Sequence, residues 1–276
     1  MKHVLLALVF GCALYTAPAQ LKTPAPSSTQ TLRQDFGLSY IELSYSRPGI
    51  KGRKIFGDVV PFGKVWRTGA NGATTLTFGD AVTIGGVKIP AGKYGLLSIP
   101  DQDSWTMIIT KQLNVTSPAA YKIENDVVRI PVKPITFQYP IETFTMLFAD
   151  VTPNSCTLQL LWENTIIMLP ITTDIDTKIM GQIKEQVEGD GRPYFDAAMY
   201  YMDNGKDLNK ALDWFNKSLV QSPGAFFILY QKAVCLSKLG RKQEAIDTAN
   251  KGITAATAAK NDDYVALNKK LIASLK

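Results

Sequence analysis

Residues 44–71 concentrate side chains that can bind an anion. Six cations face a single carboxylate there, and the cations are Arg47, Lys51, Arg53, Lys54, Lys64 and Arg67. The planar guanidinium of arginine matches carboxylate, phosphate and sulfate groups. Next to Arg67, Trp66 is placed to stack on a sugar ring, and Asn71 can bond a hydroxyl group. We therefore take Arg47, Arg53, Trp66, Arg67 and Asn71 as the candidate ligand-binding residues.

The same stretch also has a structural interpretation. Its five glycines and two prolines permit tight turns, and such turns expose backbone carbonyls. One arginine can donate five hydrogen bonds to these carbonyls, and Trp66 can belong to the core. We expect Arg47, Arg53 and Arg67 to lie within one patch, where their like charges need solvent, protein acceptors or an anion. We expect acceptors of the same domain to hold at least two of the three guanidinium groups.

The N-terminus predicts export. Residues 1–19 combine a cationic start, an apolar run and the cleavage site Ala17-Pro18-Ala19, which leaves Gln20 as the new N-terminus. The apolar run is shorter than the roughly 20 residues of a spanning helix, so we expect no transmembrane segment. An alternative is lipoprotein processing with a lipid anchor at Cys12. Either way, we expect a periplasmic or extracellular protein.

Export limits the chemistry that the chain can perform. Cleavage removes the single histidine, His3, which excludes Ser-His-Asp and Cys-His nucleophile systems and a histidine general base. Cys156 and Cys235 remain and are predicted to be buried free thiols, too few for a thiolate zinc site. We assign no catalytic, cofactor-binding or metal-binding residue. The net charge of +6 favours anionic surroundings, but no dense basic helix suggests nucleic acid as a partner.

Paired carboxylates are the remaining route to hydrolysis, as in glycosidases. The acids considered are Glu42, Asp58, Asp80, Glu142, Asp150 and Glu163. None of them lies in a recognisable catalytic motif, and solvated charge is the competing interpretation for each.

Residues 33–173 have the pattern of a β domain. Short runs rich in Val, Ile, Thr and aromatic residues alternate with turn residues, which favours an antiparallel β-sandwich or a barrel-like fold. Gly85-Gly86 is a signal for a two-residue hairpin, and Glu163-Asn164 is a weaker one. Before this domain, residues 20–32 lack periodicity and are predicted to be a flexible lead-in.

Residues 174–276 predict a helical module. Apolar residues recur every four positions from Ile175 to Val187, and a 34-residue interval relates Ala211 to Ala245. That interval is the signature of tetratricopeptide repeats. We expect two such units, at about 193–223 and 225–257, and a capping helix over 261–275.

Three segments carry a family resemblance. "SRPGIKGRKIFGDVVPFGKVWRTGANGATTLTF", "IPAGKYGLLSIP" and "WTMIITK" resemble the domain-of-unknown-function family 2911, found in exported proteins of Bacteroidetes and their relatives. The resemblance covers about residues 33–172. It implies a β-rich domain after an export signal, often followed by helical repeats, with no established activity. Where such families often have "QWG", this chain has Gln112-Leu113-Asn114, so a ligand contact from that tryptophan is missing.

Two function classes follow. The first is an exported, non-enzymatic envelope protein whose β domain binds a glycan or another anionic ligand and whose helical repeats dock a protein partner. The alternative is a histidine-free hydrolase that acts on envelope polysaccharide through carboxylates.

Overall fold

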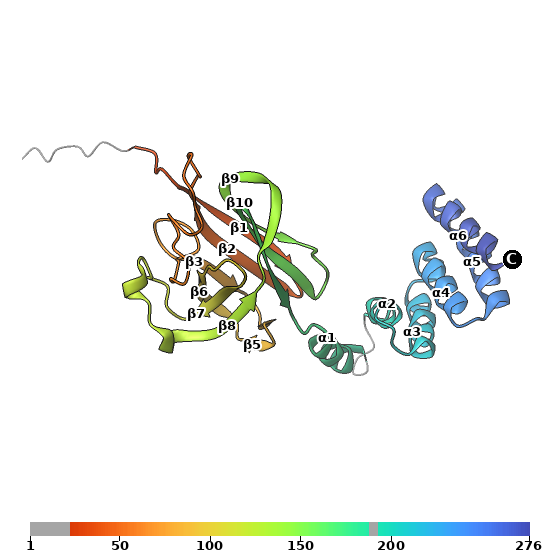
Figure 1. Ribbon diagram of the computed structural model, residues 1–276. Coiled ribbons are helices and arrows are strands. Elements are labelled where there is room, and N and C mark those ends of the chain that lie inside the picture. Colours follow the sequence, from red (N-terminus) through yellow and green to blue (C-terminus); the bar gives the residue numbers. More distant parts are fainter. Residues whose placement is uncertain (1–22, 188–192) are drawn as a thin grey trace, which may run out of the picture. The chain divides into compact units, whose positions relative to one another are not determined.

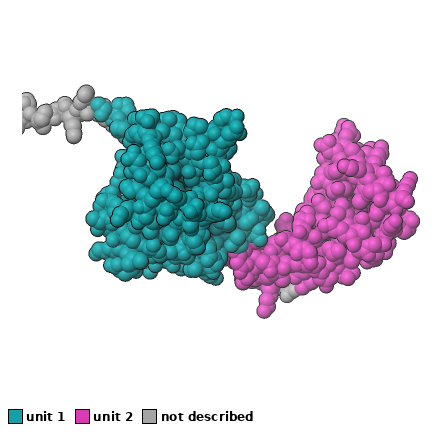
Figure 2. Space-filling model, viewed as in Figure 1, with its two compact units in different colours: residues 1–173 teal, residues 174–276 magenta. Residues whose placement is uncertain are grey.

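The computed structural model describes residues 23–187 and 193–276 (Figure 1). Contacts divide the chain into two compact units, Met1–Thr173 and Asp174–Lys276, which Figure 2 colours teal and magenta. The boundary falls where the hydrophobic period changes. The expected signal peptide at 1–19, the N-terminus at Gln20 and the alternative lipid anchor at Cys12 lie outside the described residues and stay predictions.

The first unit, called the β unit below, consists of two antiparallel sheets, as the sequence predicted. Its strands are β1 (Ser28–Phe36), β2 (Ser39–Arg47), β3 (Thr74–Phe78), β4 (Val82–Ile84), β5 (Val87–Ile89), β6 (Gly92–Ile99), β7 (Trp105–Thr110), β8 (Asp126–Val132), β9 (Ile135–Ala149) and β10 (Ser155–Thr172). One sheet has the order β1-β2-β3-β6-β7-β8, and the other has the order β5-β4-β10-β9.

Both sheets contribute to the larger of the two hydrophobic clusters in the described part of this unit. Along β2, Ile41, Leu43 and Tyr45 are buried, and along β10 the buried positions include Leu158 and Leu160. These residues are two apart, so one face of each strand is apolar and turns inward. Alternation of this kind is what identified the β domain in the sequence.

Three local predictions have different outcomes. The Gly85-Gly86 hairpin is confirmed, because β4 pairs with β5 and both glycines have positive φ. The lead-in prediction is wrong for residues 28–32, because β1 begins at Ser28 and pairs with β2 along its whole length. Polar alternation on this half-exposed edge strand hid the pattern. The Glu163-Asn164 hairpin is also wrong, since β10 runs through both residues with irregular pairing to β9.

The second unit, called the helical unit below, is all helix in its described part. It contains α1 (Asp176–Gln182), a π-helical continuation η3 (Ile183–Val187), α2 (Tyr194–Asp203), α3 (Leu208–Gln221), α4 (Phe226–Lys238), α5 (Lys242–Ala258) and α6 (Asp262–Leu275). Small residues such as Ala211, Ala245 and Ala249 are fully buried, which lets neighbouring helices approach closely.

Two further properties bear on function. Cys156 and Cys235 are free and buried, as predicted, and burial raises the pKa of Cys156 to about 11. A thiol with such a pKa is a poor nucleophile near neutral pH. In the described part of the chain, no helix is long and apolar enough to cross a membrane.

Candidate functional site

The β2–β3 loop, residues 48–73, contains most of the candidate binding residues. Connections of this length without regular structure are uncommon in compact domains, and they are often functional. Backbone hydrogen bonds fix its first part to β9: the Ile50 N–H donates to the Glu142 carbonyl at 2.8 Å, and the Phe144 N–H donates to the Pro48 carbonyl at 2.9 Å. The loop is therefore an ordered part of the β unit.

Two of the candidate carboxylates hold the same loop. Glu142 Oε1 accepts from the Lys51 N–H at 2.9 Å. Glu163 Oε1 accepts from the Ile55 N–H at 3.3 Å, and its Oε2 lies 3.5 Å from the Phe56 nitrogen. Both carboxylates thus satisfy loop donors that have no strand partner, which is a structural role.

Arg47 and Arg53 also bind the protein itself. Arg47 donates from Nε to the Phe144 carbonyl at 3.2 Å and from Nη2 to the Thr145 hydroxyl at 3.0 Å. Arg53 donates from Nε to the Ile50 carbonyl at 3.0 Å and from Nη2 to the Gly49 carbonyl at 2.7 Å. The structural interpretation accounts for both side chains.

Trp66 and Asn71 are likewise engaged. The Trp66 ring stacks on Trp162 with centroids 5.7 Å apart and contacts Phe56 edge-on at 6.1 Å. Its Nε1 donates to the Gly69 carbonyl at 3.0 Å. Asn71 Nδ2 donates to the Ser27 carbonyl at 3.1 Å and to the Ser46 hydroxyl at 3.2 Å. The Trp66 ring is therefore part of the aromatic core.

Arg67 differs from the other two arginines. Its Nη1 donates to the Thr116 carbonyl, in a segment that neither Arg47 nor Arg53 binds. Its Nε is buried and, among the described residues, has no hydrogen-bond partner. A buried donor without a partner costs about 1–3 kcal/mol, so this atom can gain from an acceptor that reaches it.

The backbone beside Arg67 is strained. Thr68 has φ of +53° and is fully buried, and a β-branched residue rarely adopts this conformation. Its hydroxyl pairs with that of Ser98 at 2.9 Å, its carbonyl accepts from the Thr74 hydroxyl, and Trp66 forms an isolated bridge to Ser98. Such strain persists only where the surroundings over-determine the backbone, and it clusters at functional sites.

A cavity of about 190 Å³, the Arg67 pocket, opens beside this corner. Its lining consists of Val59, Val60, Pro61, Lys64, Trp66, Arg67, Thr116, Ser117 and Pro118. Lys64 is exposed and forms no ion pair with a described residue. The pocket therefore combines two cations with a largely apolar wall, which suits a small anion that carries an apolar body.

Other carboxylates show no comparable arrangement. None of the six acids considered for hydrolysis lines the Arg67 pocket or three other pockets found among the described residues. A pocket of about 290 Å³ does contain Asp101 and Asp103, but it also contains Lys133 and has Trp105 in its wall. Among the described residues, no group of three His, Cys, Asp or Glu side chains could hold a metal ion.

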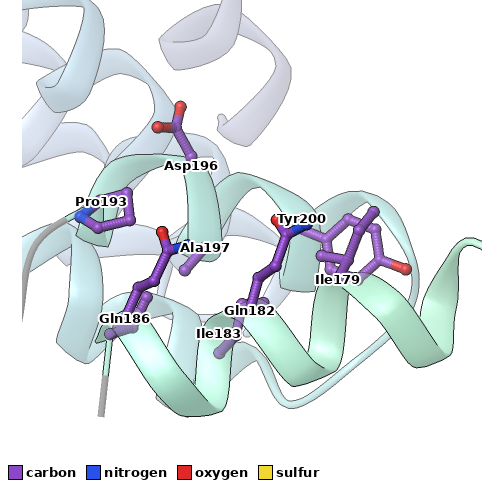
Figure 3. A pocket seen from close by; sticks show the side chains of 9 residues that line it. Ile179, Gln182, Ile183, Gln186, Pro193, Asp196, Ala197 and Tyr200 are labelled. Carbon is purple, nitrogen blue, oxygen red and sulfur yellow. The ribbon is translucent and has the colours of Figure 1, made fainter. Parts of the chain in front are cut away.

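The helical unit has a pocket of its own, the α1–α2 pocket, with a volume of about 220 Å³ (Figure 3). Its lining consists of Ile179, Gln182, Ile183, Gln186, Val187, Pro193, Asp196, Ala197 and Tyr200. At its edge, the Tyr200 hydroxyl donates to Asp176 Oδ1 at 2.7 Å, and Lys206 Nζ lies 2.7 Å from the same oxygen. Hydrogen bonds from Lys206 and then Tyr200 lower the pKa of Asp176, and burial followed by the bond to Asp176 raises the pKa of Tyr200 to about 12.

Aromatic rings also connect three helices of this unit. Phe195 on α2 contacts Phe227 at 5.3 Å, Phe227 contacts Phe226 at 5.9 Å, and Phe226 contacts Tyr264 on α6 at 5.0 Å. We call these four residues the aromatic row. Phe227 is 38% exposed, so part of the aromatic row stays accessible to another molecule.

Sequence reasoning missed several residues of these pockets. Lys64 was counted among the cations of the stretch but not selected, and Thr116 carries no signal because its contribution is a backbone carbonyl. Gln182 and Gln186 are four apart in a predicted helix, so their common face was readable. The role of Thr68 could not be predicted from the sequence, because a strained φ depends on tertiary contacts.

Comparison with known proteins identifies one family: residues 27–171 match the family described as "Protein of unknown function (DUF2911)". No curated protein and no solved structure matches the chain.

Proposed function

The chain belongs to the DUF2911 family. From the geometry of the Arg67 pocket, we propose that the chain is a non-enzymatic binding protein whose β unit holds an anionic ligand there. The observation that carries this proposal is the Arg67 guanidinium, whose buried Nε lacks a partner among the described residues while Lys64 lines the same pocket. A carboxylate, sulfate or phosphate oxygen at that point satisfies Nε and neutralises both cations.

The rigid corner at Thr68 supports the same proposal. Because the bonds around Thr68 fix the backbone next to Arg67, the guanidinium is held in place before a ligand arrives. A glycan fragment with an acidic group fits this chemistry, since the apolar wall can contact the sugar ring. Trp66 belongs to that wall, and its ring also stacks on Trp162.

Binding measurements on matched lysine variants test this proposal. Lys64 and Lys54 are both exposed residues of the β2–β3 loop, and Lys54 does not line the pocket. We expect Lys64→Gln to weaken the binding of a sulfated disaccharide about tenfold in calorimetry, the value of one charged hydrogen bond, and Lys54→Gln to leave it within about twofold. Equal losses in both variants indicate net charge alone and contradict a site.

Arg67 is tested in the same way against Arg53, whose guanidinium binds only loop carbonyls. Arg67→Gln is expected to weaken sulfated-disaccharide binding more than Arg53→Gln does. A neutral disaccharide of the same size is the ligand control, and it should bind neither the wild type nor the two variants. If the wild type binds neither sugar up to millimolar concentration, the proposal for the β unit is wrong.

For the helical unit, we propose tetratricopeptide-like repeats that dock a protein partner. The pairs α2–α3 and α4–α5 are helix-turn-helix units followed by α6, and Gly205 and Gly240 have the positive φ typical of the turn after a first helix. The partly exposed aromatic row supplies the apolar contact area that partner binding needs.

Photo-crosslinking in the native host tests partner docking. A photoreactive residue replaces Phe227 in the aromatic row or, as a control, Val220 on α3, which is 80% exposed. We expect a discrete protein adduct only from position 227. Equal labelling from both positions indicates random collisions and contradicts a docking surface there.

We also propose that the protein is exported to the cell envelope, which the N-terminal residues 1–19 support. N-terminal sequencing of the protein from its native host should give Gln20. Finding Met1 in the bulk of the mature protein contradicts export, and a lipid-modified Cys12 replaces cleavage at Gln20 with lipid anchoring.

A further inference from the structure

The α1–α2 pocket contains two side-chain amides that have no hydrogen-bond partner among residues 23–187 and 193–276. Gln182 and Gln186 are exposed, and neither amide forms a hydrogen bond with another described residue. Figure 3 shows the two side chains projecting side by side from the lower helix, with their amide ends directed the same way. Each amide can donate one hydrogen bond and accept another at the same time.

The remaining lining limits what can bind beside these amides. Ile183 and Val187 are buried and form an apolar floor with Ala197. The volume of about 220 Å³ is below the roughly 300–1,000 Å³ of pockets that hold drug-sized ligands. The pocket therefore suits a short stretch of polypeptide with small side chains better than a cofactor.

We propose that the α1–α2 pocket binds an extended peptide segment of a protein partner, with Gln182 and Gln186 bonded to the backbone of alternate residues. This inference rests on the proposed docking function of the helical unit and names a site and a ligand class for it. In an extended chain, the N–H and C=O groups of residues two apart point to the same side and repeat every 6.6–6.8 Å or so. The two glutamines are four residues apart, which is a rise of about 6 Å along an α-helix, and their flexible side chains cover the difference.

Charge adds a preference for basic segments. Asp196 lines the pocket, is exposed and forms no ion pair with a described residue, and no described lysine or arginine belongs to the lining. A lysine or arginine side chain of the bound segment can pair with this carboxylate without displacing a protein cation. An acidic segment meets repulsion at the same point.

The backbone of the pocket wall is also unusual. The helix changes from α to π geometry at Ile183, so Gln186 and Val187 lie in the π segment. Short π turns are rare and occur frequently at functional sites, where they redirect side chains. The Gln186 amide projects from this π segment, and the Gln182 amide projects from the α-helical turn before it.

Peptide binding tests the proposal directly. The full chain is applied to an array of 12-residue synthetic peptides of random sequence, and the strongest binders are measured in solution by fluorescence anisotropy. We expect the binders to be enriched in lysine and arginine. Gln182→Ala and Gln186→Ala should each weaken binding at least fivefold, whereas Gln231→Ala, which removes a glutamine of α4 outside the pocket, should change it less than twofold.

Two further measurements distinguish recognition of the peptide backbone from nonspecific binding. Two N-methylated versions of a binder are compared, one methylated at its odd-numbered residues and one at its even-numbered residues. One version should bind at least tenfold more weakly and the other less than twofold more weakly, because only one edge of an extended chain faces the glutamines. Asp196→Asn should remove the preference for basic peptides, and Asp203→Asn, an exposed acid at the end of α2 that does not line the pocket, should retain it.

The outcomes distinguish this inference from the proposed function. If the glutamine variants bind peptides normally but Phe227→Ala loses binding, the site is the aromatic row, so the inference is overturned and partner docking stands. The inference is also overturned if both N-methylated peptides lose the same affinity, or if no peptide in the array binds. Partner docking then depends only on the crosslinking result at Phe227.

Discussion

The β2–β3 loop and the α1–α2 pocket use their polar groups in opposite ways. At the loop, Arg47 at the end of β2 and Arg53 within the loop donate to carbonyls of the β unit, and Glu142 and Glu163 accept from N–H groups of the loop. In the pocket, two glutamine amides project from a helix without a partner among the described residues. The polar groups of the cation-rich β2–β3 loop thus mostly bind the protein itself, whereas the glutamine amides of the α1–α2 pocket can bind another molecule.

Both of our proposals therefore rest on unused hydrogen-bonding capacity rather than on charge density. The same criterion separates residues within the loop: the Nε of Arg53 donates to the Ile50 carbonyl, whereas the buried Nε of Arg67 has no partner among the described residues. Lys64 lines a pocket, but Lys54 does not. The following variants test whether the loop is as firmly built as its contacts indicate, beginning with the largest expected effect.

Trp66→Ala should cause the largest loss of stability. The ring packs against Trp162, Phe56 and Trp105, and removing a packed tryptophan typically costs about 3–5 kcal/mol. Urea unfolding monitored by far-ultraviolet circular dichroism measures the change. Tyr139→Ala is the control, because Tyr139 is 67% exposed and its loss should matter little. A change below about 1 kcal/mol for Trp66→Ala indicates that the loop is not part of the core.

Arg47→Ala should lower the free energy of unfolding by about 1.5–3 kcal/mol. Its guanidinium donates to the Phe144 carbonyl and the Thr145 hydroxyl, and charged hydrogen bonds contribute about this much. Lys54→Ala removes the same charge from an exposed position and should stay within about 0.5 kcal/mol. If the two variants lose the same stability, the role of Arg47 is electrostatic at long range rather than local.

Glu163→Gln should have a smaller effect, about 1–2 kcal/mol. The amide keeps one acceptor oxygen but presents a donor to one of the two loop N–H groups, which leaves that group unsatisfied. The same variant addresses the hydrolase alternative. If the wild type hydrolyses an envelope polysaccharide and Glu163→Gln abolishes this while leaving stability unchanged, the structural role argued here for Glu163 is wrong.

Much of the fold follows from the sequence, because period and turn chemistry are local properties. Alternation predicted the strands, and Gly85-Gly86 predicted the hairpin that the structure contains. The errors occur where tertiary contacts decide. The polar pair Glu163-Asn164 has the composition of a turn, but Glu163 binds loop N–H groups, and Asn164 Nδ2 donates to the Phe137 carbonyl at 2.9 Å.

The candidate site was only partly predictable for the same reason. Residue types marked the β2–β3 loop as a place that binds anions or carbonyls, and they could not assign each arginine to one or the other. That assignment depends on where carbonyls such as those of Gly49 and Thr116 lie after folding. Nothing in the sequence marks Thr116, because every residue has a carbonyl.

The smallest effect on stability is expected from the hydrogen bond that Tyr200 on α2 donates to Asp176 on α1, called the latch below. Burial and this hydrogen bond raise the pKa of Tyr200 to about 12, above the value of about 10 for an unfolded chain. The folded state therefore holds this proton more tightly than the unfolded state. The resulting stability is fully present below pH 10 and is lost as the pH rises from about 10 to about 12.

Absorbance titration of phenolate measures this effect. Burial also raises the pKa of Tyr121 in the β unit to about 12, so Tyr121 and Tyr200 should both titrate late in the folded wild type. Tyr200→Phe and Tyr121→Phe should each remove one of them. Asp176→Asn should move one phenol to lower pH, because the neutral amide no longer opposes formation of the phenolate, while the Tyr121 signal stays in place. If Asp176→Asn leaves the upper end of the titration unchanged, the latch does not form, and the wall of the α1–α2 pocket depends on apolar packing alone.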